Sequence, residues 1–129
     1  MVFIKNLVKK RLPLSPKKIK DIAVSMLGTK YEISIVVGGD ALLKKLNVSY
    51  RKKKDTTNVL SFSLAPNLGE VFLNEKRIAL EARISGKKVG EHFAYILIHA
   101  LLHLKGFAHG STMEREEKKI LSRFSRITN

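Results

Sequence analysis

The sequence of 129 residues contains no cysteine and no tryptophan, and only three prolines and eight glycines. The lack of cysteine excludes disulfide bonds, CxxC redox chemistry, cysteine-type zinc fingers and a cysteine nucleophile. Because prolines and glycines are few, no segment has the composition of a long linker, and the length fits one domain over residues 1–129. No apolar run approaches the roughly 20 residues that a membrane helix needs, so we expect no helix that crosses a membrane. Residues 1–16 lack the apolar stretch and cleavage site of a signal peptide, which favours a cytoplasmic protein.

Basic residues strongly outnumber acidic ones. The chain has 25 Lys and Arg against 11 Asp and Glu, a formal net charge of +14 with neutral histidines. An excess of this size predicts a polyanionic partner such as nucleic acid, or a membrane surface. Hydrophobic residues make up 44% of the chain, which is typical of a globular protein and not of a disordered one. Aromatic residues make up 7%, so a rich base-stacking platform is not expected.

The expected strands and helices are interleaved along the chain. Strands are expected near residues 2–7, 31–35, 59–64 and 70–73, where apolar residues alternate or cluster between turn residues. Helices are expected at 15–28, after Asp40, at 78–84, at 91–104 and from a capping box at 111–114. Residues 51–57 are expected to form a polar, basic loop. This order predicts an α+β fold, with a single small mixed sheet of about four strands packed with about five helices.

Three of the four histidines, His99, His103 and His109, lie within eleven residues. His99 and His103 are four residues apart in the expected helix 91–104, so their imidazoles share one face, one turn apart. Gly106 ends this helix, and the returning chain brings His109 close enough to give a third nitrogen. Three neutral imidazoles with one open position make a catalytic zinc site. The pattern H-x3-H-x2-G-x2-H therefore predicts one Zn2+ held by three histidines and a water, on a zincin-like metal helix.

The same histidines allow other interpretations. A single histidine on an apolar helix is more often a hydrogen-bonded core residue than a ligand, but the joint spacing favours a metal. Zinc proteases share this spacing and use a Glu after the first histidine as general base, where this chain has Ala100. The protease interpretation therefore lacks its base. His92 lies seven residues before His99, too far along the helix to share one ion, and we expect it at the surface or beside the ligands.

Four motifs follow one another in the chain: Tyr50-Arg51, Thr57-Asn58-Val59-Leu60-Ser61-Phe62-Ser63, Leu68-Gly69-Glu70-Val71 and His99-Ala100-Leu101-Leu102-His103-Leu104-Lys105-Gly106-Phe107-Ala108-His109. In this order they resemble the motifs of the YbeY family, bacterial ribosomal-RNA maturation factors described as zinc-binding single-strand endoribonucleases. The central motif of that family runs His-Gly-x-Leu-His-Leu-x-Gly-Tyr-Asp-His. The similarity extends over about residues 46–110. Among the departures from the family pattern, Asn58 and Ala108 replace Asp, Ser63 replaces Pro, and Ala100 replaces Gly.

The resemblance implies that His99, His103 and His109 are zinc ligands, and that Arg51 is a functional arginine near the metal and thus our candidate catalytic residue. It also narrows the polyanionic partner to RNA, and to ribosomal RNA at the ribosome above all, so we expect no membrane partner. Ala108 lacks the carboxylate that could support the last ligand or act as a base, so we expect this departure to affect catalytic strength and not metal binding. Asn58 can hydrogen-bond as Asp does, but it carries no charge and takes no proton at neutral pH.

Arg51 begins a run of four cations. Its planar guanidinium suits phosphate oxygens and could neutralise the charge that develops during phosphodiester cleavage. We expect the whole run to bind RNA with a strong salt dependence: Arg51, Lys52, Lys53 and Lys54. Tyr50 is the aromatic residue to consider for base stacking, against the commoner role of core packing. Glu70 is a candidate base, although a solvent-facing strand residue is its commoner role.

Three functions are compatible with these residues. The first is a zinc-dependent single-strand endoribonuclease that acts in ribosomal RNA maturation and ribosome quality control. The second is a non-catalytic RNA- or ribosome-binding factor in which the zinc is structural. The third is a metal hydrolase for another substrate, with the basic surface serving only to localise it. Loss of cleavage together with loss of zinc in His103→Ala would separate the first from the second.

Overall fold

The computed structural model describes residues 1–106 and 111–128 and contains four strands and five helices in that part of the chain. The strands are β1 (Val2–Asn6), β2 (Glu32–Gly38), β3 (Val59–Ala65) and β4 (Leu68–Asn74). The helices are α1 (Pro16–Leu27), α2 (Asp40–Arg51), α3 (Glu75–Ile84), α4 (Val89–Leu104) and α5 (Ser111–Thr128). The predicted α+β fold is confirmed, with one mixed sheet and the expected numbers of strands and helices. The single-domain organisation stays a prediction.

The four strands form one sheet in the order β1-β2-β4-β3. β1 and β4 both run parallel to β2, whereas β3 and β4 form an antiparallel hairpin through the turn at Pro66 and Asn67. β2 is the inner strand between two parallel neighbours, and its residues from Ile35 to Gly38 are all buried. Coverage on both faces explains why the strand extends beyond the alternating segment 31–35 that the sequence indicated. β3 is left at the edge of the sheet.

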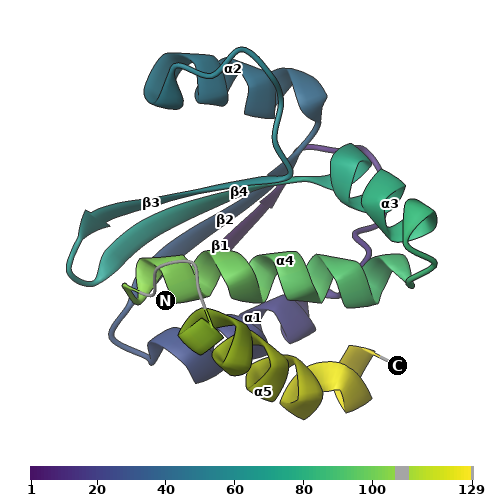
Figure 1. Ribbon diagram of the computed structural model, residues 1–129. Helices are drawn as coiled ribbons and strands as arrows, with labels where there is room; N and C mark the ends of the chain where they lie inside the picture. Colours follow the sequence, from purple (N-terminus) through teal and green to yellow (C-terminus); the bar gives the residue numbers. More distant parts are fainter. Residues whose placement is uncertain (107–110, 129) are drawn as a thin grey trace.

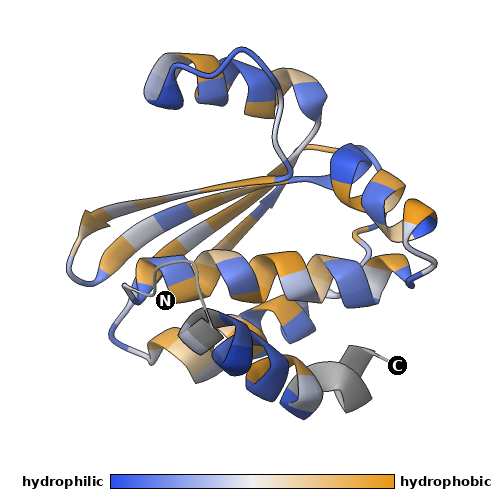
Figure 2. Cartoon of the chain, in the orientation of Figure 1, coloured by the Kyte–Doolittle hydropathy of each residue, from blue (hydrophilic) through white to orange (hydrophobic). Residues whose placement is uncertain are grey.

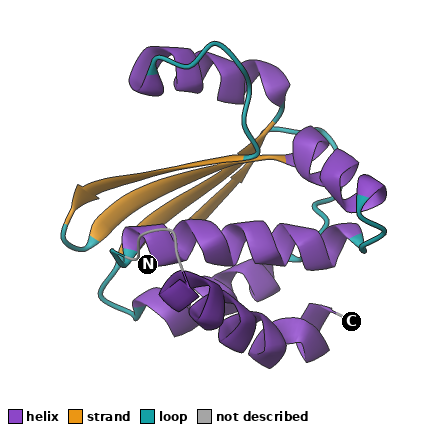
Figure 3. Ribbon diagram, viewed as in Figure 1, coloured by secondary structure: helices purple, strands orange, loops and turns teal. Residues whose placement is uncertain are grey.

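The helices lie on both faces of the sheet (Figures 1 and 3). α1, α4 and α5 are layered on one face, and α2 lies on the other. The main core fills the space between the sheet and α4, with Ile33, Ile35 and Val71 from strands and Phe93 and Leu97 from α4. Figure 2 shows apolar residues along the strands and α4, and hydrophilic ones over much of α2. No helix in the described residues has the length and apolar character that a membrane crossing requires.

Local signals set most of the helix ends. The Ser15 hydroxyl accepts a hydrogen bond from the Lys18 backbone N–H at 3.2 Å, and Pro16 is the first residue of α1, as expected of this pair. Gly28 ends α1 at a φ of 86°, in the region that glycine adopts readily. Asn74 caps α3 through a 3.1 Å bond from the Arg77 N–H, so α3 begins at Glu75 and not near residue 78.

Two expected boundaries around α2 are wrong. The cap is Gly39, not Asp40, because the Asp40 carboxylate accepts a 2.7 Å hydrogen bond from the Asn74 side chain instead of turning back to the helix. Arg51 is the last residue of α2 and does not begin the following loop. The helix ends at Lys52, whose φ of 54° is left-handed. The backbone of Arg51 therefore belongs to the last turn of a helix.

Gly69 in β4 packs against the end of α4, and we predict that Gly69→Ala destabilises the protein. A Cβ at this position would lie 2.6 Å from the Tyr31 hydroxyl oxygen and 3.2 Å from a methyl group of Leu104. Both neighbours belong to the packed interior, so the expected cost is about 1–3 kcal/mol of unfolding free energy. Urea unfolding measures it.

Tyr31→Phe provides the matched test of this explanation. The Tyr31 hydroxyl is buried and has no hydrogen-bond partner among the described residues, so its removal alone should cost little. In the Gly69→Ala background the same change removes the closest contact and should restore part of the lost stability. Equal losses in the single and double variants would contradict the explanation.

Candidate active site

One face of α4 carries a row of four rings, from His92 through Tyr95 and His99 to His103. Their spacing of three or four residues places them on consecutive turns of the same face. The ring centres of His92 and Tyr95 are 6.0 Å apart, those of Tyr95 and His99 6.4 Å, and those of His99 and His103 4.8 Å. The remaining faces of α4 are largely buried in the core. This row is therefore where α4 presents polar atoms to the rest of the molecule.

The two histidines at the end of the row point their Nε2 atoms toward each other. The His99 and His103 Nε2 atoms are 3.3 Å apart. Two ligands at about 2.0–2.1 Å from a tetrahedral zinc ion are separated by about 3.3–3.4 Å, since the angle at the metal is close to 109°. The observed distance fits two ligands of a single zinc ion. Imidazole nitrogens also suit this metal.

His109, the third predicted ligand, lies outside the described residues. Within residues 1–106 and 111–128, no three histidine, aspartate or glutamate side chains gather as a metal-binding group. The described residues thus provide a pair of imidazoles and no third ligand of these types. Metal binding by His99, His103 and His109 stays a prediction.

The histidine pair opens into a pocket of about 740 Å3 between α4 and the edge strand β3. Because side chains alternate along a strand, Val59, Ser61 and Ser63 all face this pocket. Arg51 lines it from the end of α2, and Thr57 and Asn58 line it from the loop before β3. The remaining lining residues are Leu60, Tyr95, Ile96, His99, Ala100, His103 and Leu104. Arg51 lies about fifty residues before the histidines in the sequence. The fold thus brings this predicted site residue into one pocket with His99 and His103.

The other residues predicted from the sequence lie elsewhere. Lys52, Lys53 and Lys54 are exposed and do not line the pocket. Glu70 pairs with Phe62 across the hairpin, on the sheet face opposite to Ser61 and the histidines, so it is not placed to act as a base there. Tyr50 is 70% exposed, with its ring edge-on to Phe62 at 5.5 Å, and is therefore not a core residue.

Buried asparagines fix the segment between Arg51 and β3. Asn74 is fully buried, and its side-chain amide donates to the Asp40 carboxylate at 2.7 Å and to the Thr56 hydroxyl and Thr57 carbonyl at 3.1 Å each. The Asn47 amide donates to the Asp55 carbonyl at 2.6 Å. A buried amide with partners at this many positions rigidifies the backbone that it contacts. The loop that carries Asn58 into the pocket is thereby attached to α2 and β4.

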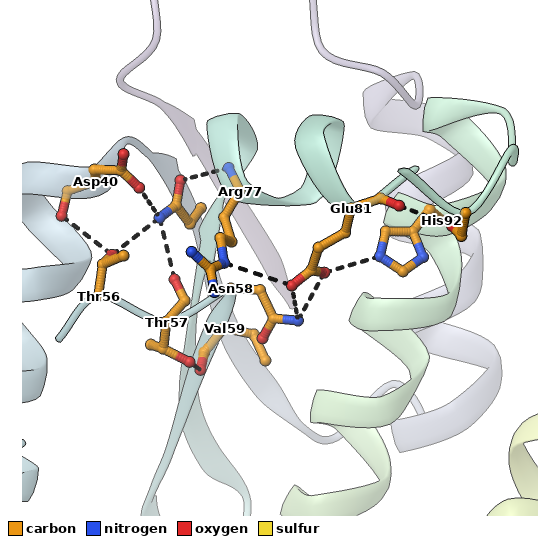
Figure 4. Close-up of polar contacts among 10 residues, drawn as sticks. Asp40, Thr56, Thr57, Asn58, Val59, Arg77, Glu81 and His92 are labelled. Atoms are coloured by element: carbon orange, nitrogen blue, oxygen red, sulfur yellow. Dashed lines mark hydrogen bonds and ion pairs between the residues drawn. The ribbon is translucent and has the colours of Figure 1, made fainter. Parts of the chain in front are cut away.

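A second polar cluster surrounds Glu81 of α3, beside the pocket (Figure 4). The Glu81 carboxylate accepts a hydrogen bond from the Asn58 amide at 3.1 Å and from His92 Nε2 at 2.9 Å, and Arg77 Nε lies 3.7 Å away. Burial alone would raise the pKa of Glu81, but the hydrogen bonds from His92 and Asn58 and the charges of His92 and Arg77 outweigh it and lower the pKa. His92 is 8% exposed, so our expectation of a surface position is wrong. The ring is a buried contact between α3 and α4.

The sequence interpretation missed Glu117 of α5, which is 5% exposed and contacts His99 Nδ1. The sequence did contain a signal for a buried carboxylate at this position. In the amphipathic helix from Ser111, Glu117 lies three residues before Ile120, at a position where the apolar stripe calls for a hydrophobic residue. A carboxylate in such a stripe requires a partner inside the protein. Asn47 and Asn74 were missed for a different reason, because nothing in their local sequence distinguishes a buried asparagine from a turn residue.

Comparison with known proteins identifies the family. The family model described as Endoribonuclease YbeY matches residues 5–128. The chain belongs to the YbeY family. Relatives named Endoribonuclease YbeY include those of Parvibaculum lavamentivorans, 38% identical over 108 residues, and Neorickettsia sennetsu, 33% identical over 117 residues. The alignment covers 71% of this chain and 58% of the first protein, and 82% of both chains for the second.

A solved structure shows the same fold. The solution structure of TM1509 from Thermotoga maritima superposes with a TM-score of 0.70 at 23% identity, over 94% of this chain and 87% of that one.

The relative from Anaplasma phagocytophilum is 40% identical over 94 residues, which cover 69% of this chain and 61% of that protein. The chain thus spans about three fifths of the length of two of the curated relatives that it matches, those from Parvibaculum and Anaplasma.

The contacts of Asn58 predict that restoring the acidic residue of the family motif destabilises this chain. In Asn58→Asp a carboxylate replaces the amide that donates to Glu81, so two like charges face each other beside the pocket. We expect a loss of about 1–3 kcal/mol of unfolding free energy at about pH 8. The loss should shrink near pH 4.5, since one carboxyl of the pair then takes a proton and can donate a hydrogen bond. Thermal unfolding at both pH values measures it.

Asn58→Ala is the control for this prediction. It removes the hydrogen bond without adding a charge, so its loss of stability should depend far less on pH. If Asn58→Asp were as stable as the wild type at high pH, the assigned contact between Asn58 and Glu81 would be wrong.

Proposed function

We propose that this protein is a metal-dependent endoribonuclease that cuts single-stranded RNA. The observation that carries the proposal is that Arg51, His99 and His103 line one and the same pocket. A cation site and a guanidinium in one open pocket suit a phosphodiester, whose charge increases on the way to the transition state. The relatives named Endoribonuclease YbeY support the same reaction class.

We infer that the metal is one Zn2+ held by His99, His103 and His109, with a fourth position left open. The 3.3 Å separation of the His99 and His103 Nε2 atoms supports this assignment. The ion would supply Lewis-acid chemistry to the phosphodiester when bound. Because the sequence contains no cysteine, imidazole and carboxylate are the side-chain groups available as strong zinc ligands.

The protein residues around this site would bind and orient the RNA strand. Arg51 would contact two phosphate oxygens through its planar fork, which a lysine cannot do. Ser61 and Ser63 line the same pocket and would donate hydrogen bonds to the strand. Lys52, Lys53 and Lys54, exposed beside Arg51, would contact phosphates further along the backbone. Tyr50, with 70% of its surface exposed, is available to stack on a base at the edge of this surface.

The biological setting that we propose is ribosomal RNA maturation in the cytoplasm, with RNA at or near the ribosome as the partner. The net charge of +14 supports binding to a polyanion such as RNA. The family model over residues 5–128 supports the same setting through the resemblance described above.

The metal assignment predicts that His103→Ala loses both bound zinc and RNA cleavage. Removal of one of three imidazoles weakens the site, and activity should fall to background. Elemental analysis measures the zinc, and cleavage of a labelled single-stranded RNA measures the activity. Lys105→Ala is the control, because Lys105 is exposed just beyond the end of α4 and should leave both properties unchanged.

The same experiment separates the alternative functions. A wild-type protein that binds zinc and RNA but never cuts, with a His103→Ala variant that unfolds, would support a structural zinc in an RNA-binding factor. Cleavage at the wild-type rate by metal-free protein, in preparations shown to be free of contaminating nuclease, would overturn the proposed mechanism.

The position of Arg51 predicts that Arg51→Ala lowers kcat/KM by about 100-fold while zinc content stays at the wild-type level. Arg51→Lys should recover part of this loss, since it keeps the charge but not the two-pronged geometry. Lys53→Ala is the matched control, because Lys53 is an exposed cation of the same run that does not line the pocket. Its effect should be small and should decrease as salt is added. A similar loss in Arg51→Ala and Lys53→Ala would show that Arg51 acts only as a surface cation.

A further inference from the structure

Glu117 is a buried carboxylate on a helix whose neighbouring residues are mostly exposed. Ile120, one turn later on the same face of α5, belongs to the core, and Leu121 packs against it. This anchoring directs the Glu117 side chain toward α4, against which α5 packs. A carboxylate removed from water in this way requires strong hydrogen-bond donors.

Two donors from α4 meet Glu117. Its Oε1 atom contacts His99 Nδ1 directly. The Tyr95 hydroxyl also donates a hydrogen bond to Glu117, and the pKa of Tyr95 is raised by its burial and by this carboxylate. Tyr95 and His99 are neighbours in the row of rings on α4. One carboxylate therefore fixes two adjacent rings of that row.

The contact determines which nitrogen of His99 carries the proton. A carboxylate at Nδ1 accepts a hydrogen bond, so the ring proton resides on Nδ1 and the lone pair on Nε2. That Nε2 atom lies 3.3 Å from His103 Nε2 and faces the pocket. A neutral ring with its lone pair on Nε2 is the form that binds a cation through that atom, and the carboxylate increases the basicity of the ring.

We propose that Glu117 is a positioning residue that holds His99 in its Nδ1-protonated form, with Nε2 directed at the cation site that it shares with His103. The proposal rests on the metal site of the proposed function and adds a requirement for α5, since the cation site is complete only when α5 is docked on α4. The pocket and α5 are thereby coupled through a single buried side chain.

The first test compares zinc affinities at one fixed pH above the range in which histidine takes a proton, using competition with a chromophoric chelator. Glu117→Ala should weaken zinc binding by about 10- to 100-fold, the usual effect of removing a carboxylate behind a ligating histidine. Glu117→Gln should lose less, because the amide oxygen still accepts the hydrogen bond from Nδ1. Glu116→Gln removes the same charge one residue away and should change the affinity less than about twofold.

The second test reads the tautomer of His99 directly in metal-free protein, by long-range 1H–15N NMR of the imidazole ring. The wild type and Glu117→Gln should show the proton on Nδ1, and Glu117→Ala should lose this preference. This readout does not depend on activity, and a merely structural role of Glu117 would not produce rescue by glutamine.

The outcomes separate this proposal from the proposed function. If the wild type binds one zinc but all Glu117 variants bind it equally tightly, the positioning role is wrong and the nuclease proposal stands. If wild-type His99 carries its proton on Nε2, the positioning role is also wrong. If the wild type binds no zinc and His103→Ala changes nothing, the metal site and the role of Glu117 are overturned together.

Discussion

The packing of α4 between the sheet and the other helices of its layer is the constraint on which the site depends. Most of its surface is buried against the core, including Phe93, Leu97 and Leu101. Polar side chains on such a helix are confined to its one remaining face. His99 and His103 lie on that face, and the open pocket lies between them and the edge strand β3. The apolar packing of α4 thus decides where the imidazoles point.

Two half-buried or buried carboxylates lie along the ring row of α4. Glu81 of α3 contacts His92 near the start of the helix, and Glu117 of α5 contacts His99 closer to its end. Each carboxylate comes from a different flanking helix, so the row is fixed from both sides. Hydrogen bonds of this kind hold rings in one orientation and one tautomer. The pocket is consequently positioned by two helices, neither of which contributes a described residue to its lining.

The contacts of Asn58, Ala100 and Ser63 explain why these departures from the family pattern fit this structure. Asn58 is a donor to the Glu81 carboxylate, a contact that an aspartate could make only by taking a proton. The uncharged residue is therefore compatible with its surroundings here. Ala100 is buried beneath the pocket, where a small residue suffices for the packing of α4. Ser63 faces the pocket and adds a hydroxyl there.

The element types, the helix ends at Ser15 and Gly28, and the pairing of His99 with His103 could all be predicted from the sequence, because they follow from local spacing and backbone preference. The contacts of Asn74, Glu81 and Glu117 and the burial of His92 were decided by the tertiary structure, as was the position of Glu70 on the opposite face of the sheet. These features depend on which distant segments meet and on strand register, and no local pattern records either. Both the sequence and the fold were needed to place Arg51 in the site. Its sequence motif marked it, and the fold alone placed it in the pocket with the histidines.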